Sequence, residues 1–297
     1  MKRFLVLLAL LLFPLSGPAA DETFSDRVEE KRLYIAHLAL SACDKGRWNF
    51  VWNKCWETDV VLRNKSVRPL VVQVLWHASD GHGFTVLVHS SGHEAKAMNS
   101  EQGPLAISVP PLGVAVHTFT LPLVERSLFE NMSDWPSEAK SGWMSFETSS
   151  PDEVEVFALF RFKTKGNVVN QAYAPLSVPA TRFTSYLRRA KGENGIPVDM
   201  GFAIANPNHS GATVKFVVRD QDGKEIKLPN PFSTFIPAMG QTAEMLSDLV
   251  YFAQHDLVGS LEIVADVPVV VVALQMVGKK IAAGGEAVIS TVPVTTP

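Results

Sequence analysis

The chain has 297 residues, of which 46% are hydrophobic and 19% are charged, and its formal net charge is −3. This mildly acidic balance, without basic runs, gives no electrostatic reason to bind nucleic acid or an anionic membrane surface. Beyond the first twenty residues no segment reaches 18 uninterrupted apolar residues, so we expect no membrane span in the mature chain.

Residues 1–20 have the layout of a secretory signal peptide. Lys2 and Arg3 precede an apolar run from Phe4 to Leu15, and small residues follow it. A basic start, a short apolar run and a small-residue exit are typical of a leader that is removed on export. The run is too short to span a bilayer comfortably, so a retained helix is the weaker interpretation. We expect a secreted or periplasmic protein, with residues 21–31 as a flexible leader.

Two cysteines, Cys43 and Cys55, follow in "SACDKGRWNFVWNKCW". An even cysteine count in an exported chain predicts a disulfide, and closing a loop of this size is worth roughly 3 kcal/mol. The alternative is two free thiols or a metal pair, but the CxxC spacing that zinc sites favour is missing. We therefore predict a disulfide between Cys43 and Cys55.

Three aromatic residues alternate between these cysteines: Trp48, Phe50 and Trp52. In a strand all three would project from one face, where they could stack on sugar rings or anchor a protein partner. They could equally be the apolar side of a disulfide-clipped hairpin that packs onto its own domain, and small covers of this kind usually pack. We keep Trp48, Phe50 and Trp52 as candidate ligand-binding residues.

One 23-residue pattern occurs twice, 142 positions apart. "DVVLRNKSVRPLVVQVLWHASDG" begins at Asp59, and "GFAIANPNHSGATVKFVVRDQDG" begins at Gly201. In both, apolar residues recur at every second position after an Asn-containing turn, which is typical of a half-buried strand. Both end in Asp-Gly, which favours a hairpin turn. We therefore expect Asn64, Asn206 and the Asp-Gly pairs to be structural.

The correspondence continues along the chain, and its constant order and spacing indicate an internal duplication. The aligned landmarks are Pro110–Gly113 with Pro237–Gly240, Gly142 with Gly259, Val154–Leu159 with Val269–Leu274, and the two Val-Pro dipeptides that begin at Val178 and Val292.

Many short strands with Pro and Gly turns predict an all-β fold of two tandem antiparallel β-sandwich domains of immunoglobulin-like size. The first would cover residues 32–180 and include the disulfide-clipped insert, and the second would cover 181–297. Each copy also has one segment with some helical character, "LPLVERSLFENM" and "AEMLSDLVYFAQH".

The second copy carries the blocks "GFAIANPN", "IPAMGQTAEML", "GSLEIVADVPVVVVAL" and a terminal "VPV", and the first copy ends in "FALFRFKTKGNVVNQAYAPLSVPA". In this order the chain resembles a tandem β-sandwich module of exported bacterial proteins, over most of residues 32–297. The resemblance implies the fold and an exported location, and no catalytic or ligand-binding residue. The chain departs from the module in its insert between Cys43 and Cys55 and in its longer first copy.

The copies differ most between the Asp-Gly turn and the aligned proline, where the first has 28 residues (82–109) and the second has 13 (224–236). The longer segment carries His82, His89 and His93. The last two are four residues apart, but the intervening Ser-Ser-Gly disfavours a metal-binding helix. Glu94 also lies outside the pair rather than inside it, as HExxH requires. We predict solvated loop histidines and no metal site.

No coherent catalytic set is visible, because GxSxG, HExxH and Gly-rich phosphate loops are missing and the carboxylates are scattered through turns and exposed strand faces. "DQDGKE", from Asp220, lacks the later ligands of an EF-hand loop. We therefore predict no catalytic residue and no cofactor.

The sequence thus favours an exported, non-catalytic binding or structural protein with a protein or glycan partner outside the cytoplasm. The alternatives are a carbohydrate-binding module that uses the aromatic strip and a metal-dependent enzyme built on the first-copy histidines.

Overall fold

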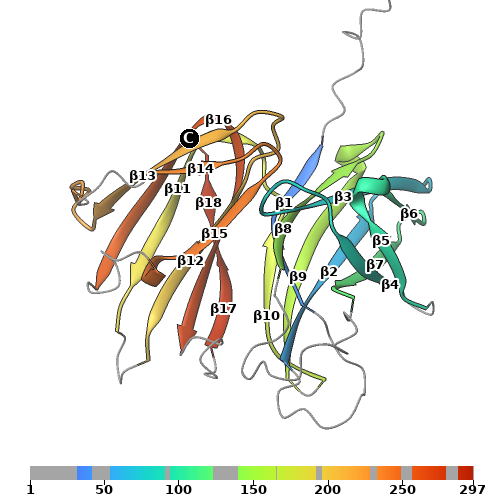
Figure 1. Cartoon of the computed structure of the whole chain (residues 1–297), viewed down its shortest axis with the longest axis horizontal. Helices are drawn as coiled ribbons and strands as arrows, with labels where there is room; N and C mark the ends of the chain where they lie inside the picture. The colour runs from blue at the N-terminus through green and yellow to red at the C-terminus, as the bar shows by residue number, and fades with distance from the viewer. Residues whose placement is uncertain are drawn as a thin grey trace, which may run out of the picture. The chain divides into compact units, whose positions relative to one another are not determined.

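The computed structural model describes residues 32–41, 54–90, 94–122, 140–164, 166–191, 196–227, 233–248, 256–278 and 287–296. These residues form antiparallel β-sheets (Figure 1), which confirms the predicted all-β, sandwich-type fold. Residues 31–297 form one compact unit, so the division into two separate domains stays a prediction.

The first half forms two sheets. One has the order β1-β8-β3-β6 and the other the order β10-β9-β2-β7-β4-β5, with every pair antiparallel. The strands are β1 (Leu33–Leu40), β2 (Lys54–Asn64), β3 (Leu70–Ala78), β4 (Thr85–Ser90), β5 (Lys96–Asn99), β6 (Leu105–Val109), β7 (Val114–Thr120), β8 (Lys140–Glu147), β9 (Val154–Thr164) and β10 (Asn167–Pro175), with 3-10 turns η1 (Ser100–Gln102) and η2 (Pro151–Glu153).

The second half repeats this order, with one long strand taking part in two sheets. The first part of β16 pairs with β11 and β13, and its second part pairs with β12 and β17. The strands are β11 (Ala180–Arg189), β12 (Val198–Ala205), β13 (Ala212–Asp220), β14 (Ser233–Ile236), β15 (Gln241–Met245), β16 (Leu257–Gly278), β17 (Ala287–Val292) and β18 (Val294–Thr295), with the 3-10 turn η4 (Leu246–Asp248).

Strand pairing supports the duplication that the sequence indicates. Two strands of the first half, β8 and β9, together occupy the place of the long strand β16 in the second half. The remaining equivalent strands, matched by their pairing, are β1 with β11, β2 with β12, β3 with β13, β6 with β14, β7 with β15 and β10 with β17. The hairpin β4–β5 has no counterpart in the described residues of the second half, and it widens the first half's second sheet to six strands. This hairpin is the extra segment that begins at His82.

Both Asp-Gly pairs lie in turns, as predicted. Gly81 and Gly223 have φ values of 88° and 77°, which glycine adopts without strain. Asp80 Oδ1 accepts a hydrogen bond from the backbone N–H of His82, and Asp220 Oδ1 accepts one from that of Lys224. The Asp220 carboxylate of "DQDGKE" therefore serves the turn.

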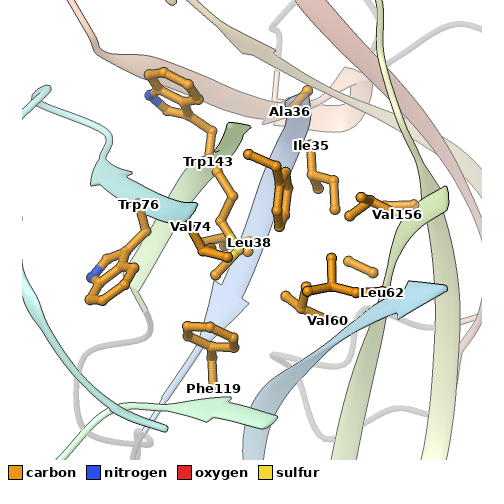
Figure 2. Close-up of a cluster of buried hydrophobic side chains, with 14 of the residues drawn as sticks. Ile35, Ala36, Leu38, Val60, Leu62, Val74, Trp76, Phe119, Trp143 and Val156 are labelled. Carbon is orange, nitrogen blue, oxygen red and sulfur yellow. The ribbon is translucent and has the colours of Figure 1, made fainter. Parts of the chain in front are cut away.

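The first half's core fills the space between its two sheets. Figure 2 shows side chains of β1, β2, β3, β7 and β9 converging there, including the completely buried Trp76 and Phe119, whose rings meet edge to face at 5.8 Å. Burying such large apolar side chains supplies most of the driving force for folding. A second core, around Phe183, Leu187 and Ile263, lies in the second half.

The predicted helical segments are only partly described. In the second copy Ala243–Met245 belong to β15 and only Leu246–Asp248 form a helical turn, so the helix was predicted to begin too early. The remainder of that segment, and all of the first-copy segment after Pro122, lie outside the described residues.

Candidate functional site

Trp48, Phe50, Trp52 and Cys43 lie outside the described residues, so the aromatic site and the disulfide pairing stay predictions. The second cysteine, Cys55, is buried in β2, with 5% of its surface exposed.

The first-copy histidines lie partly in strands, so their prediction as solvated loop residues was wrong for His89. His89 belongs to β4, and its Nε2 lies 3.2 Å from the Thr120 hydroxyl. On the neighbouring strand, His117 Nδ1 lies 2.8 Å from the Ser90 hydroxyl, and burial lowers the pKa of His117. Across the described residues no three His, Cys, Asp or Glu side chains come together as a metal site would need. His93 lies outside the described residues.

Two further histidines lie where the halves meet. The ring of His77 stacks on Trp143 at 4.6 Å, and burial lowers the pKa of His77. The half-buried His37 lies against Phe160, and the Gln241 amide nitrogen is 3.0 Å from its Nδ1. Burial lowers the pKa of His37 from 6.5 to about 4, so this ring is neutral near pH 7.

The six-stranded sheet has one side packed on the core and one side turned away from it, which we call the open face. In β2 and β9 the core-facing side chains alternate with open-face side chains, since Cβ atoms alternate along a strand. The open face is formed by Glu57, Asp59, Val61 and Arg63 of β2, Val114, Val116 and Thr118 of β7, Glu155, Phe157, Leu159, Arg161 and Lys163 of β9, and Tyr173 of β10.

Four charged side chains form a network at one end of the open face. Arg161 Nη2 lies 2.7 Å from Glu57 Oε1 and 2.5 Å from Asp59 Oδ1, and Lys163 Nζ lies 2.6 Å from Glu57 Oε1. Thr118 donates a further hydrogen bond of 2.6 Å to Asp59. The network balances two negative and two positive charges, so neither carboxylate is left uncompensated.

Sequence reasoning missed this network. Glu57 and Asp59 are only 4% and 6% exposed, so the expectation that carboxylates lie in turns and exposed strand faces was wrong for this pair. The available signal was the alternation of charge with aromatic residues in "CWETD" and "FRFK". It could not show that Arg161 would lie opposite Glu57 across two paired strands.

The remainder of the open face is apolar and partly exposed. Val114, Val116 and Tyr173 expose 53%, 44% and 44% of their surfaces, and the Tyr173 ring lies 5.4 Å from that of Phe157. Val61 lies opposite both Val116 and Phe157, so these side chains form one row across β7, β2 and β9. Apolar area of this kind, bordered by charge, is typical of a protein interaction surface.

No protein-family model matches the chain, and no curated protein matches it. Within the described residues no helix is long and apolar enough to cross a membrane.

Proposed function

We propose that the protein is an exported, non-catalytic binding or structural protein built of duplicated β-sandwich modules, and that the open face is its binding surface. The sequence blocks that resemble modules of exported bacterial proteins support this proposal.

The observation that carries the proposal is the exposure of Val114 and Val116 on β7 and of Tyr173 on β10, which share one sheet face and are connected across β2 and β9 by Val61 and Phe157. Contiguous apolar patches are uncommon on soluble monomers and often mark interaction sites. Here the patch lies on strands held rigid from below by the core, since Val60, Leu62 and Ala158 beneath it are completely buried. A rigid apolar face loses little conformational entropy on binding.

The charge network adds specificity to this surface. Arg161 and Lys163 hold Glu57 and Asp59 in fixed positions at the edge of the apolar row. A partner that covers the row must therefore present polar groups that match this edge, because burying an unpaired charge is costly.

A photo-crosslinker placed in the exported protein tests this function. Val116→benzoylphenylalanine is expected to give a specific crosslinked product in the native compartment. Val71→benzoylphenylalanine is the matched control, since Val71 is a strand valine that is 53% exposed and lies on the other sheet. Equal products from both positions, or none from either, would contradict a binding role for the open face.

Export is tested separately by mass. A chain expressed with its leader is expected to be recovered outside the cytoplasm without residues 1–20, because the leader has a small-residue cleavage site. Recovery of the uncleaved chain from the cytoplasm would remove the exported part of the proposal.

A further inference from the structure

The second half contacts the first half through the sheet face that corresponds to the open face. Ala203, Ala205, Val270 and Val272 of β12 and β16 belong to the first half's hydrophobic core cluster. We use the name docking face for these four residues together with Met239 and Gln241 of the adjacent turn.

The surface that accepts the docking face, here called the receiving site, consists of Ala36, His37, His77, Ser79, Gly81 and Trp143 of the first half. Trp143 donates a 2.7 Å hydrogen bond to the carbonyl of Met239, and in Figure 2 its ring points away from Val74 and Leu38. The backbone N–H of Gln241 donates to the carbonyl of Ser79 over 2.9 Å.

Close backbone approach makes one position of the receiving site intolerant of a side chain. A Cβ on Gly81 would collide with the carbonyl oxygen of Ala238, which precedes Met239 in the docking turn. The glycine is therefore required both by its positive φ and by the docked turn.

Register assigns each part of the docking face a counterpart on the open face. Ala203 lies opposite Ala243 and Val272, as Val61 lies opposite Val116 and Phe157. The other equivalent pairs are Ala205 with Arg63, Val270 with Glu155, Gln241 with Val114, and Met239 with Leu112. Met239 and Leu112 are also the only non-glycine residues with positive φ among those described.

The counterparts differ in whether anything covers them. Gln241 is 4% exposed, whereas Val114 is 53% exposed, and Leu112 at the free turn is 66% exposed. The first half thus has an uncovered equivalent of the surface that the second half buries.

The second half correspondingly has an uncovered receiving site. By register its residues are Tyr186, Arg219, Gln221, Gly223 and Ser260. Gly223 takes the place of Gly81, and Ser260 takes the place of Trp143. A Cβ on Gly223 would meet nothing within 4 Å, and Tyr186 is 47% exposed.

We propose that the open face docks onto the free receiving site of a second copy of this chain, in the way the second half docks onto the first. The inference deepens the proposed binding function by naming the partner. Each chain then offers one open face and one receiving site, so association is head-to-tail and open-ended rather than a closed symmetric dimer.

Charge favours the second copy as the occupant. Both surfaces carry charges at positions that are uncharged in the intramolecular pair: Arg63 and Glu155 replace Ala205 and Val270, while Arg219, which pairs with Glu262, replaces His77. Each surface carries both signs, so they can pair across the contact. Such an interface is expected to be weaker than the internal one and to weaken further with salt.

Sedimentation of the mature chain over rising concentration is the direct test. We expect reversible association that extends beyond the dimer, with an association constant that falls as salt is raised. A chain that remains monomeric up to about 1 mM, where even weak contacts are populated, overturns the inference.

Two single-site variants test the two surfaces. Val114→Asp is expected to weaken association at least about tenfold, because its counterpart Gln241 is buried in the internal contact, so the new charge would lie in a desolvated contact. Its control, Val71→Asp, is expected to leave association unchanged. Gly223→Asn keeps a residue that tolerates positive φ but adds a side chain where the docked turn would lie, so it is expected to abolish association. Gly166→Asn is its control, with φ 80° and open space around it.

Mixing the two variants decides the geometry. Val114→Asp retains a receiving site and Gly223→Asn retains an open face, so the mixture is expected to form dimers and nothing larger. A Gly223→Asn chain that associates like the native chain would show face-to-face pairing and overturn the inference. Native chains that stay monomeric while the crosslinker at position 116 captures a different exported protein would overturn the inference and leave the proposed function standing.

Discussion

Asn206 repeats the hydrogen bonds of Asn64. The Asn64 side-chain nitrogen donates to the carbonyls of Arg68, Val109 and Pro110, over 2.6–3.2 Å. The Asn206 side-chain nitrogen donates to the carbonyls of the corresponding residues, Ser210, Ile236 and Pro237, over 2.7–3.3 Å. Both side chains are at most 1% exposed, so each ties a turn to the neighbouring strand from inside.

Removing either amide is expected to destabilise the fold. We expect Asn64→Ala and Asn206→Ala each to lower the free energy of unfolding by about 2 kcal/mol or more, because three carbonyls lose a donor, and one of these hydrogen bonds is buried and the other two partly buried. Urea denaturation measures this. Asn99→Ala is the control: its side chain accepts a single hydrogen bond, from Glu101, so a loss of about 1 kcal/mol or less is expected. Equal losses at positions 64 and 99 would contradict the assignment.

The charge network should also be sensitive to the loss of one partner. Arg161→Met is expected to cost about 3–5 kcal/mol, because it leaves Asp59 and part of Glu57 buried without their cation. The exposed pair of Arg63 and Glu155, 3.3 Å apart on the same face, provides the control. Arg63→Met is expected to change stability by less than about 1 kcal/mol. Thermal and urea unfolding of both variants compares them directly.

Stability should fall as pH falls from about 6.5 to about 4. The folded-state pKa of His37 is depressed to about 4, so over this range the unfolded chain binds a proton that the folded chain does not. The loss from His37 is at most about 3 kcal/mol. Protonation would also place an N–H of His37 against the amide nitrogen of Gln241.

The variant His37→Met is expected to flatten this pH dependence, measured as the free energy of unfolding at pH 7.5 and 4.5. A residual slope is expected from His77 and His117, whose pKa values burial also lowers. An unchanged slope in His37→Met would show that this histidine is not the group responsible.

The predicted disulfide can be checked by mass. Without reductant, alkylation of the denatured native chain is expected to modify neither Cys43 nor Cys55. Reduction is expected to lower the free energy of unfolding by roughly 3 kcal/mol, the value of closing a loop of this size. Alkylation of two thiols without reductant would overturn the prediction.

The aromatic strip has its own test, because the proposed function places binding on the open face. A glycan array is expected to show no signal above background for the native protein. A signal that disappears in the Trp48→Ala, Trp52→Ala double variant would favour the carbohydrate-binding alternative instead.

Local pattern was enough to predict the strands, the turns and the duplication. Period-two apolar residues select strands because side chains alternate across a sheet, and Asp-Gly selects turns because glycine accepts positive φ. Asn64 and Asn206 could be assigned to turns because they hold matching places in two copies of one pattern. These are properties of neighbouring residues, which the order of amino acids carries directly.

Which sheet faces are covered depended on contacts between distant residues. Val154–Leu159 alternates, with Glu155 exposed, whereas its counterpart Val269–Leu274 is an unbroken apolar run. In the structure the run is buried on both sides, since Val271 faces the second core and Val270 and Val272 belong to the first. An apolar run alone does not say what covers its second face.

The open face was likewise beyond local pattern. The burial of Glu57 and Asp59 depends on Arg161, which is more than a hundred positions away in sequence and lies directly across the paired strands. The amino-acid sequence by itself determined the repeated strand-and-turn unit. Only the tertiary structure decided that the outer face of the second copy is covered by the first half while that of the first copy is left exposed, because burial is set by packing between residues that lie far apart in the sequence.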